Sequence, residues 1–168
     1  MRSSVLAASL ILATVASGPA FAQSSAPSAA PNAAVQARAT QFSPASMAAV
    51  QVVTDFMTAL ASGQLEAARQ LMTVDAVVMA NGQVLGDREG YIDGAAKGDS
   101  AALRNVQREL LHRDASAGSD LAWVLSEKRM RGPVGGRGDL MVTETMLLAK
   151  TPAGWKITHI HWSGRPAG

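Results

Sequence analysis

The last strand of this chain sets its architecture, and it reads Gly154-Trp155-Lys156-Ile157-Thr158-His159-Ile160-His161-Trp162-Ser163-Gly164-Arg165. Successive side chains of a strand point to opposite faces. One face would therefore carry Trp155, Ile157, His159 and His161, and the other Thr158, Ile160 and Trp162. Because apolar side chains fall on both faces, the pattern predicts a strand in a curved sheet that is covered on each surface.

Upstream of that strand, the chain is expected to begin with helices and to continue as a meander of long strands. Helices are predicted over 43–62, 65–72 and 87–97, and strands over 74–79, 83–85, 103–114, 120–130, 140–150 and 154–165. Ser43-Pro44 is typical of a helix start, Gly63 of a stop, and Asn81-Gly82 of a hairpin turn. This order indicates an α+β fold, in which a strongly curved, mostly antiparallel sheet wraps over N-terminal helices and encloses a pocket.

The N-terminus has the pattern of an export signal. Arg2 is followed by an apolar run over 5–15 and by Ala20-Phe21-Ala22, a small-residue cleavage site. We expect a cleaved signal peptide over 1–22, with Gln23 as the first mature residue and a periplasmic or secreted location. A membrane anchor is the competing interpretation, but a run of about a dozen apolar residues falls short of the ~20 that span a bilayer.

Residues 23–42 are rich in Ala, Pro and Ser, which is typical of a disordered linker. The alternative is an N-terminal strap that adds to the domain over 43–168. The whole chain has 168 residues, of which 48% are hydrophobic, so one domain with one core is expected. Cysteine is absent, so the sequence provides neither a disulfide nor a thiol nucleophile.

The charge balance argues against a nucleic-acid partner. The chain has 15 basic and 13 acidic residues, and removal of Arg2 with the signal leaves 14 against 13. Nucleic-acid binders carry a basic stripe with aromatic platforms. The one basic cluster, at Lys128, Arg129, Arg131 and Arg137, flanks a glycine-rich turn and is interpreted as a solvated hairpin end.

Several motifs together resemble the SnoaL-like branch of the nuclear transport factor 2-like superfamily over about 45–165. They are Phe56–Gly63, Gly86–Tyr91, Asp120–Trp123, Thr143-Glu144-Thr145 and the stretch 154–163. The last two are also similar to the end of the association domain of calcium/calmodulin-dependent protein kinase. The resemblance implies a conical barrel and a homodimer formed through the sheet. Members include isomerases, cyclases, hydrolases and non-catalytic dimerisation modules, so the fold does not decide the function.

Two departures from the family limit what the resemblance implies. Ketosteroid isomerases use a tyrosine and an aspartate at places that match Phe56 and the stretch 79–81 here, so steroid isomerase activity is not expected. The kinase association domain has pocket arginines where this chain has Met146 and Trp162. An anion in that pocket is therefore not expected either.

Three groups of residues could carry chemistry. His159 and His161 could bind a metal or exchange protons near neutral pH, with His112 as the only other histidine; a structural role is favoured, and no metal is expected. Glu144 is either a pocket acid with a raised pKa or, as we favour, an ion-pair partner of Arg129 or Lys128. The tryptophans at 123, 155 and 162 either line an aromatic slot or fill the core.

The sequence thus leaves two classes of function open. The favoured one is an exported domain that binds a small apolar ligand or serves as a dimerisation module, without a cofactor. Its pocket would be lined by Phe56, Tyr91, His112, Trp123, Met146, Ile160 and Trp162. The alternative is an isomerase, cyclase or hydrolase that uses His159, His161 and Glu144, which requires those three side chains to converge on one cavity.

Overall fold

A computed structural model of the protein describes residues 42–132 and 138–167. The expected signal peptide over 1–22 lies outside the described residues, and so does the expected linker over 23–42 apart from Phe42. Within the described ranges, no helix combines the length and the apolar character needed to cross a membrane.

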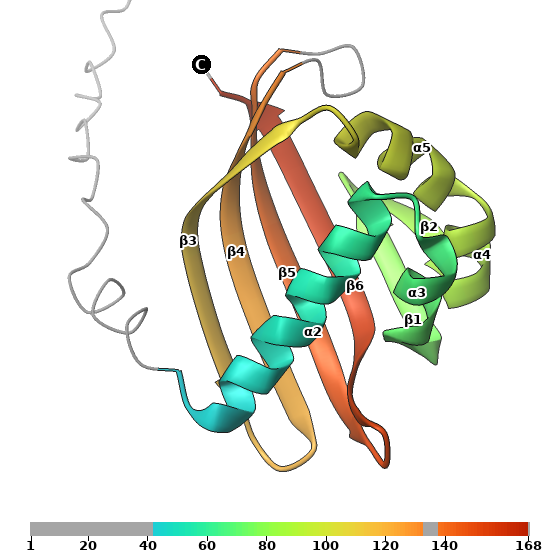
Figure 1. Ribbon diagram of the computed structural model, residues 1–168, viewed down its shortest axis with the longest axis vertical. Helices are drawn as coiled ribbons and strands as arrows, with labels where there is room; N and C mark the ends of the chain where they lie inside the picture. The colour runs from blue at the N-terminus through green and yellow to red at the C-terminus, as the bar shows by residue number, and fades with distance from the viewer. Residues whose placement is uncertain (1–41, 133–137, 168) are drawn as a thin grey trace, which may run out of the picture. The chain divides into compact units, whose positions relative to one another are not determined.

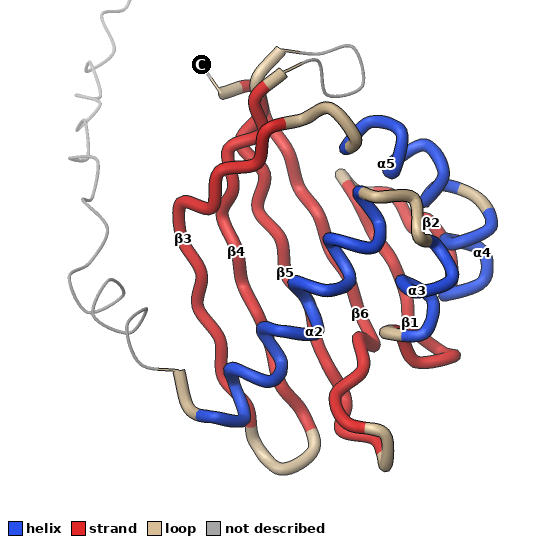
Figure 2. Tube along the Cα trace, in the orientation of Figure 1, coloured by secondary structure: helices blue, strands red, loops and turns tan. Residues whose placement is uncertain are grey.

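The fold is mixed α+β, as the order of elements predicted. A single six-stranded sheet has the strand order β2-β1-β6-β5-β4-β3. It is curved but does not close into a barrel (Figures 1 and 2). All neighbouring strands are antiparallel except β1 and β6, which are parallel. The elements are α2 (Pro44–Ala61), α3 (Leu65–Gln70), β1 (Met72–Ala80), β2 (Gln83–Asp87), α4 (Arg88–Asp93), α5 (Ala95–Leu103), β3 (Gln107–Ala117), β4 (Leu121–Arg131), β5 (Leu140–Thr151) and β6 (Gly154–Pro166).

Helix α2 crosses one face of the sheet diagonally (Figure 1). The Ser43 hydroxyl accepts a hydrogen bond from the Ser46 amide at 3.1 Å, which confirms the predicted N-cap. At the other end Gly63 has φ +77°, a conformation that glycine adopts without strain. The buried stripe of the helix, including Val53, Phe56 and Leu60, packs into the core against the inner face of the sheet. We call this helix-covered surface the inner face and the opposite one the outer face.

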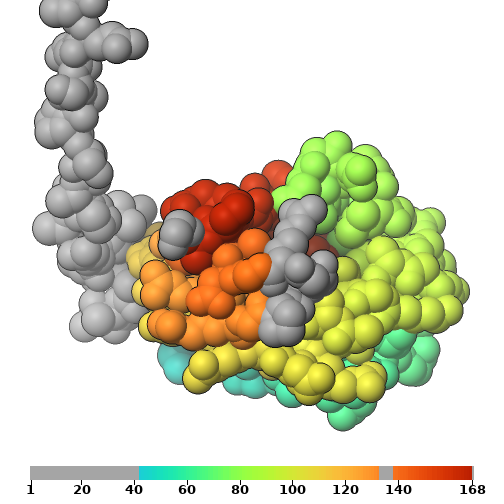
Figure 3. Space-filling model, turned by 90° about the horizontal axis from the view of Figure 1, so that it is seen from above, coloured from blue at the N-terminus to red at the C-terminus, as the bar shows by residue number. Residues whose placement is uncertain are grey.

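The helix predicted over 87–97 is in fact two helices. The Asp87 carboxylate accepts a hydrogen bond from the Gly90 amide at 2.8 Å, as a cap should, but α4 ends at Asp93. Gly94 has φ −110° and ψ −102°, which is not helical. Helix α5 then continues to Leu103, where a strand was expected, and β3 begins only at Gln107. Figure 3 shows the molecule from the side of α5, with the end of β6 (red) beside the β1–β2 hairpin (green).

A β-bulge in β6 corrects the predicted alternation of the last strand. Leu148 pairs with Ile157, whereas Leu147 pairs with His159, so Thr158 is an extra residue. Such an insertion shifts the alternation by one residue. Ile157 and Ile160 are therefore both fully buried on the inner face. The two apolar faces inferred from the sequence are largely one apolar face with a bulge in it.

Candidate functional site

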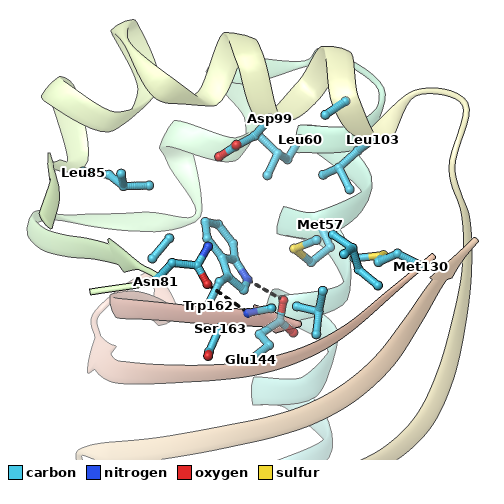
Figure 4. Close-up of a pocket in the computed structure, with 15 residues that line it drawn as sticks. Met57, Leu60, Asn81, Leu85, Asp99, Leu103, Met130, Glu144, Trp162 and Ser163 are labelled. Carbon is cyan, nitrogen blue, oxygen red and sulfur yellow. Dashed lines mark hydrogen bonds between the residues drawn. The ribbon is translucent and has the colours of Figure 1, made fainter. Parts of the chain in front are cut away.

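A cavity of about 200 Å³ lies between α2, α5, the end of β1 and the inner face of β4, β5 and β6 (Figure 4). Its wall is mainly apolar, and the exposed residues Asn81, Ser163 and Gly164 lie at its rim. The lining residues are Met57, Leu60, Ala80, Asn81, Leu85, Asp99, Ala102, Leu103, Met130, Leu140, Val142, Glu144, Trp162, Ser163 and Gly164.

One polar group of the cavity is the Glu144 carboxylate, which is 2% exposed. Oε1 accepts a hydrogen bond from Lys128 Nζ at 2.7 Å, and Oε2 accepts one from Trp162 Nε1 at 2.9 Å. Strand register explains the pair: Glu144 faces Ser126 across β4 and β5, and Lys128 lies two residues further along β4 on the same face. The ion pair predicted for Glu144 is confirmed, with Lys128 as the partner.

The burial of Lys128 corrects our interpretation of the basic cluster as a solvated hairpin end. Its side chain is 8% exposed and points inward, whereas Arg131 at the same hairpin is half-exposed. Desolvation lowers the pKa of the Lys128 ammonium, and the neighbouring Glu144 carboxylate opposes that shift. The prediction treated the basic residues beside the turn as one solvated group, whereas alternation along β4 turns Lys128 inward together with Ser126 and Met130.

The second polar group of the cavity is the Asp99 carboxyl on α5. The Tyr91 hydroxyl donates a hydrogen bond to Asp99 Oδ2 at 3.0 Å, and the tyrosine ring is fully buried. Partial burial raises the pKa of Asp99 above its ordinary value, although the Tyr91 hydrogen bond acts in the opposite direction. Burial and the nearby Asp99 also raise the pKa of Tyr91. Asp99 is thus a half-buried carboxyl, held in place by a buried phenol and facing an apolar cavity.

The rim of the cavity is held by Asn81, in the turn between β1 and β2. Asn81 has φ +49°, which asparagine tolerates better than most residues. Its side-chain Oδ1 accepts a hydrogen bond from the Gly164 amide at 3.0 Å, and its own amide donates to the Trp162 carbonyl at 3.0 Å. These two bonds fix the hairpin turn against β6 beside the cavity.

Of the residues predicted to line a pocket, only Trp162 and the candidate acid Glu144 reach this cavity. Phe56, Tyr91, Met146 and Ile160 are 0% exposed and belong to the core. Tyr91 lies directly behind the site, since its ring centroid is 6.0 Å from that of Trp162 at a tilt of 50°. These four side chains were predicted to line a pocket, but they lie in the core, where close-packed neighbours fill the space around them.

The remaining candidates lie on the outer face of the sheet. His112 pairs with Glu127, and both Trp123 and His159 pair with Leu147. These residues alternate along their strands with the residues that point inward, so they face outward. His161 is exposed and pairs with Thr145, whereas Glu144 and its pair Trp162 face the cavity. The histidines therefore do not converge with Glu144. Within the described residues, no three His, Cys, Asp or Glu side chains could hold a metal ion together.

The tryptophans form no common slot. Trp162 contributes to the cavity wall and Trp123 lies on the outer face. Trp155 is buried near the β5–β6 turn, with the Lys150 ammonium 4.8 Å from its ring centroid. Asp99 also lines the cavity but was not predicted from the sequence. The predicted helix ended at Lys97, two residues before Asp99, so no sequence signal placed Asp99 on a helix beside the cavity.

Comparison with known proteins places the chain in a family. The model of the SnoaL-like domain matches residues 49–167. The chain therefore belongs to the SnoaL-like family, in agreement with the motif resemblance.

Solved structures show the same fold. A protein of Shewanella frigidimarina, provisionally named a ketosteroid isomerase, is 30% identical with a TM-score of 0.65, over 69% of this chain and 94% of the other. A Streptomyces avermitilis protein of the NTF2-like family, provisionally named a dehydratase, is 22% identical with a TM-score of 0.61, over 72% of this chain and 96% of the other. A Nostoc punctiforme protein of unknown function with a cystatin-like fold is 11% identical with a TM-score of 0.60, over 72% of this chain and 91% of the other. Among curated protein sequences, none matches this chain significantly.

Proposed function

We propose that this domain binds a small, mostly apolar molecule with one polar group in the cavity between α2, α5 and the sheet. The observation that carries the proposal is an apolar cavity on which two carboxyl groups converge, Asp99 from α5 and Glu144 from β5. Ligand sites in proteins typically combine an apolar wall with a few placed polar groups. The chain belongs to the SnoaL-like family, whose fold commonly binds small ligands, and this supports the proposal.

The cavity size selects the class of ligand. A cavity of about 150 Å³ lined by apolar side chains accommodates benzene, and sites for drug-sized ligands range from about 300 to 1,000 Å³. At about 200 Å³, this cavity fits a molecule with a single ring better than a steroid. The Asp99 carboxyl can accept a hydrogen bond when ionised and donate one when protonated, and its raised pKa keeps the protonated form to higher pH than in an ordinary aspartate.

Titration with p-cresol, a single ring with one hydroxyl, tests the proposal by calorimetry or by NMR shifts. Ala102→Leu fills part of the cavity and should weaken binding at least tenfold. Ala101→Leu is the matched control, because Ala101 is the preceding residue of α5, is exposed and does not line the cavity. Native mass spectrometry of the purified protein identifies retained ligands. Equal p-cresol affinities in the two variants would contradict the proposed site.

A second candidate is an enzyme that moves a proton on such a ligand, with Asp99 as the general base. The specific observation in its favour is the raised pKa of a carboxyl in an apolar cavity, since a base works best when its pKa approaches the working pH. The provisional isomerase name of the Shewanella protein is consistent with this class. Asp99→Asn should then abolish turnover of a small enolisable ketone while leaving its binding within a few-fold.

The steroid reaction itself is not expected. Phe56 has no hydroxyl and is fully buried, and Ala80 lines the cavity where a carboxylate would be needed. General base catalysis contributes about 10²–10⁴-fold, so its loss removes most of the rate. Turnover of a β,γ-unsaturated ketosteroid by the purified protein would contradict this assignment of positions.

Export of the protein to the periplasm or the medium is a further part of the proposal. It rests on the N-terminal sequence pattern, with cleavage after Ala22. N-terminal sequencing of protein recovered outside the cytoplasm should return Gln23 as the first residue. An intact Met1 on such protein would contradict cleavage.

We also propose that two copies associate through the outer face of the sheet. Leu121 and Leu125 of β4 are 54% and 39% exposed, and Val77 of β1 is 39% exposed. Trp123 and Leu147, which pair with each other across β4 and β5, add to the same surface. Contiguous apolar patches of several hundred square ångströms on a protein surface mark interaction sites, and the resemblance to dimeric members of the superfamily supports this choice of partner.

A further inference from the structure

A second cavity, of about 240 Å³, lies between α2 and the edge strand β3. Helix α2 lines it with Thr54, Met57 and Thr58, and β4 with Lys128. Strand β3 contributes Arg108, Leu110 and Arg113. Among the described residues, Met57 alone lines both cavities, and the Lys128–Glu144 ion pair lies between them.

The second cavity gathers three cationic side chains. Lys128 is the only one of them with an ion pair to a described residue, at Glu144. Neither Arg108 nor Arg113 has a carboxylate of the described residues within 4.0 Å. Counting Glu144, the group carries three positive charges and one negative charge, a local net charge of +2.

Arg113 is held in place by neutral groups. Its Nε donates to the Ser126 hydroxyl at 3.1 Å, and Nη1 donates to the Thr54 hydroxyl at 3.2 Å. A guanidinium has five N–H donors, so these two bonds leave three donors free of partners among the described residues. The Lys128 ammonium has three donors, of which the Glu144 bond uses one.

These cations are close enough to affect one another. Desolvation is the main cause that lowers the pKa of Lys128, and the charges of Arg113 and Arg108 lower it further. Burial likewise lowers the pKa of Arg113. Desolvated like charges are unfavourable together, and an anion bound among them would relieve the repulsion.

We propose that the second cavity is a binding site for a small oxyanion, either a phosphate group or a carboxylate, held by Arg108, Arg113 and Lys128. Guanidinium groups suit this chemistry because their planar fork matches two oxygens of a carboxylate or phosphate. Met57 and Leu110 provide apolar contacts beside the three cations. The inference does not depend on the ligand proposed for the first cavity.

Calorimetric titration with inorganic phosphate, at constant ionic strength maintained with chloride, tests the site. We expect saturable binding of one phosphate per chain. Arg108→Gln and Arg113→Gln should each raise the Kd about tenfold, which corresponds to about 1.4 kcal/mol. Arg104→Gln is the matched control, because Arg104 is an exposed arginine that lines neither cavity, and it should leave the Kd unchanged.

Arg108→Gln provides the cleaner comparison, since Arg108 is exposed and bonds to no described side chain. Arg113→Gln also removes two hydrogen bonds, so its fold is checked by circular dichroism before titration. A parallel titration with acetate distinguishes a carboxylate site from a phosphate site, and binding of either anion that is weakened in Arg108→Gln supports the proposal. Failure of both anions to bind saturably, or an unchanged Kd in Arg108→Gln, would overturn it.

Discussion

At the scale of single residues, a carboxylate and an ammonium are buried together between the two cavities. The side chains of Glu144 and Lys128 are 1% and 8% exposed. Removing one partner of a buried pair leaves an uncompensated charge, which typically costs about 3–5 kcal/mol. We therefore expect Lys128→Met to lower the free energy of unfolding by about that amount in urea denaturation.

An exposed ion pair of the same sheet serves as the control. Arg131 and Glu109 form a pair at 2.9 Å with both side chains half-exposed, so Arg131→Met should cost at most about 1 kcal/mol. The double variant Lys128→Met with Glu144→Gln should recover much of the loss, because no unpaired charge remains. A cost for Lys128→Met no larger than that for Arg131→Met would contradict the buried-pair account.

Asp99 makes stability depend on pH in a defined direction. Burial raises the pKa of Asp99 in the folded state, so folded protein holds this proton more tightly than unfolded protein does. The contribution of Asp99 to stability is then fully present below the ordinary aspartate pKa of about 3.9 and is lost as pH rises through the raised value. Asp99→Asn should remove this loss, so the stability difference between wild type and variant changes with pH over that window.

Urea denaturation of both proteins between pH 3 and pH 8 measures this difference and cancels the contributions of other carboxyl groups. Tyr91→Phe removes the hydrogen bond that lowers the pKa of Asp99, so the loss should extend to higher pH. A difference curve that stays flat with pH would show that Asp99 titrates alike in folded and unfolded protein.

At the scale of elements, a single glycine accounts for the break between α4 and α5. A Cβ atom on Gly94 would lie 2.7 Å from the Gly90 carbonyl oxygen, so a larger residue forces the backbone to shift. Gly94→Ala should lower the free energy of unfolding by about 1–3 kcal/mol, the usual cost of overpacking. Gly98→Ala should instead raise it by about 0.5–1 kcal/mol, because Gly98 is within α5 and a Cβ there meets nothing within 4 Å.

The two glycine variants are compared by thermal and urea denaturation. They make the same chemical change four positions apart, at the N-cap of α5 and inside this helix, so opposite signs are expected. Destabilisation by both, or by neither, would contradict the close approach of Gly94 to α4.

The sequence predicted most elements because their signals are local. Ser43 as a cap, Gly63 as a stop and Asn81-Gly82 as a turn each act within a few residues. The bulge at Thr158 has no such signal, because the register between β5 and β6 creates it. An apparently two-faced apolar strand was therefore a one-faced strand with an inserted residue.

At the scale of the whole molecule, the site could be predicted only in part. Glu144 was identifiable as a charge within an apolar strand, and strand register then made Lys128 its partner. Asp99 faces the cavity from α5, a helix that begins after the break at Gly94 and continues past the predicted end. Some inward side chains border the cavity and others are packed by neighbours. The difference depends on how the helices pack against the sheet, and no sequence pattern encodes that packing.

The outer face of the sheet determines the assembly that we expect. We predict a dimer at micromolar concentration, and Leu125→Glu should raise its Kd at least about 100-fold, corresponding to about 2.8 kcal/mol. The reason is that two symmetric copies would bring desolvated carboxylates into an apolar contact. Met47→Glu is the control, because Met47 is 60% exposed on α2, away from the outer face. Light scattering measures the mass in solution. A wild type with the mass of one chain would exclude association through this surface, and so would a Leu125→Glu dimer as stable as the Met47→Glu dimer.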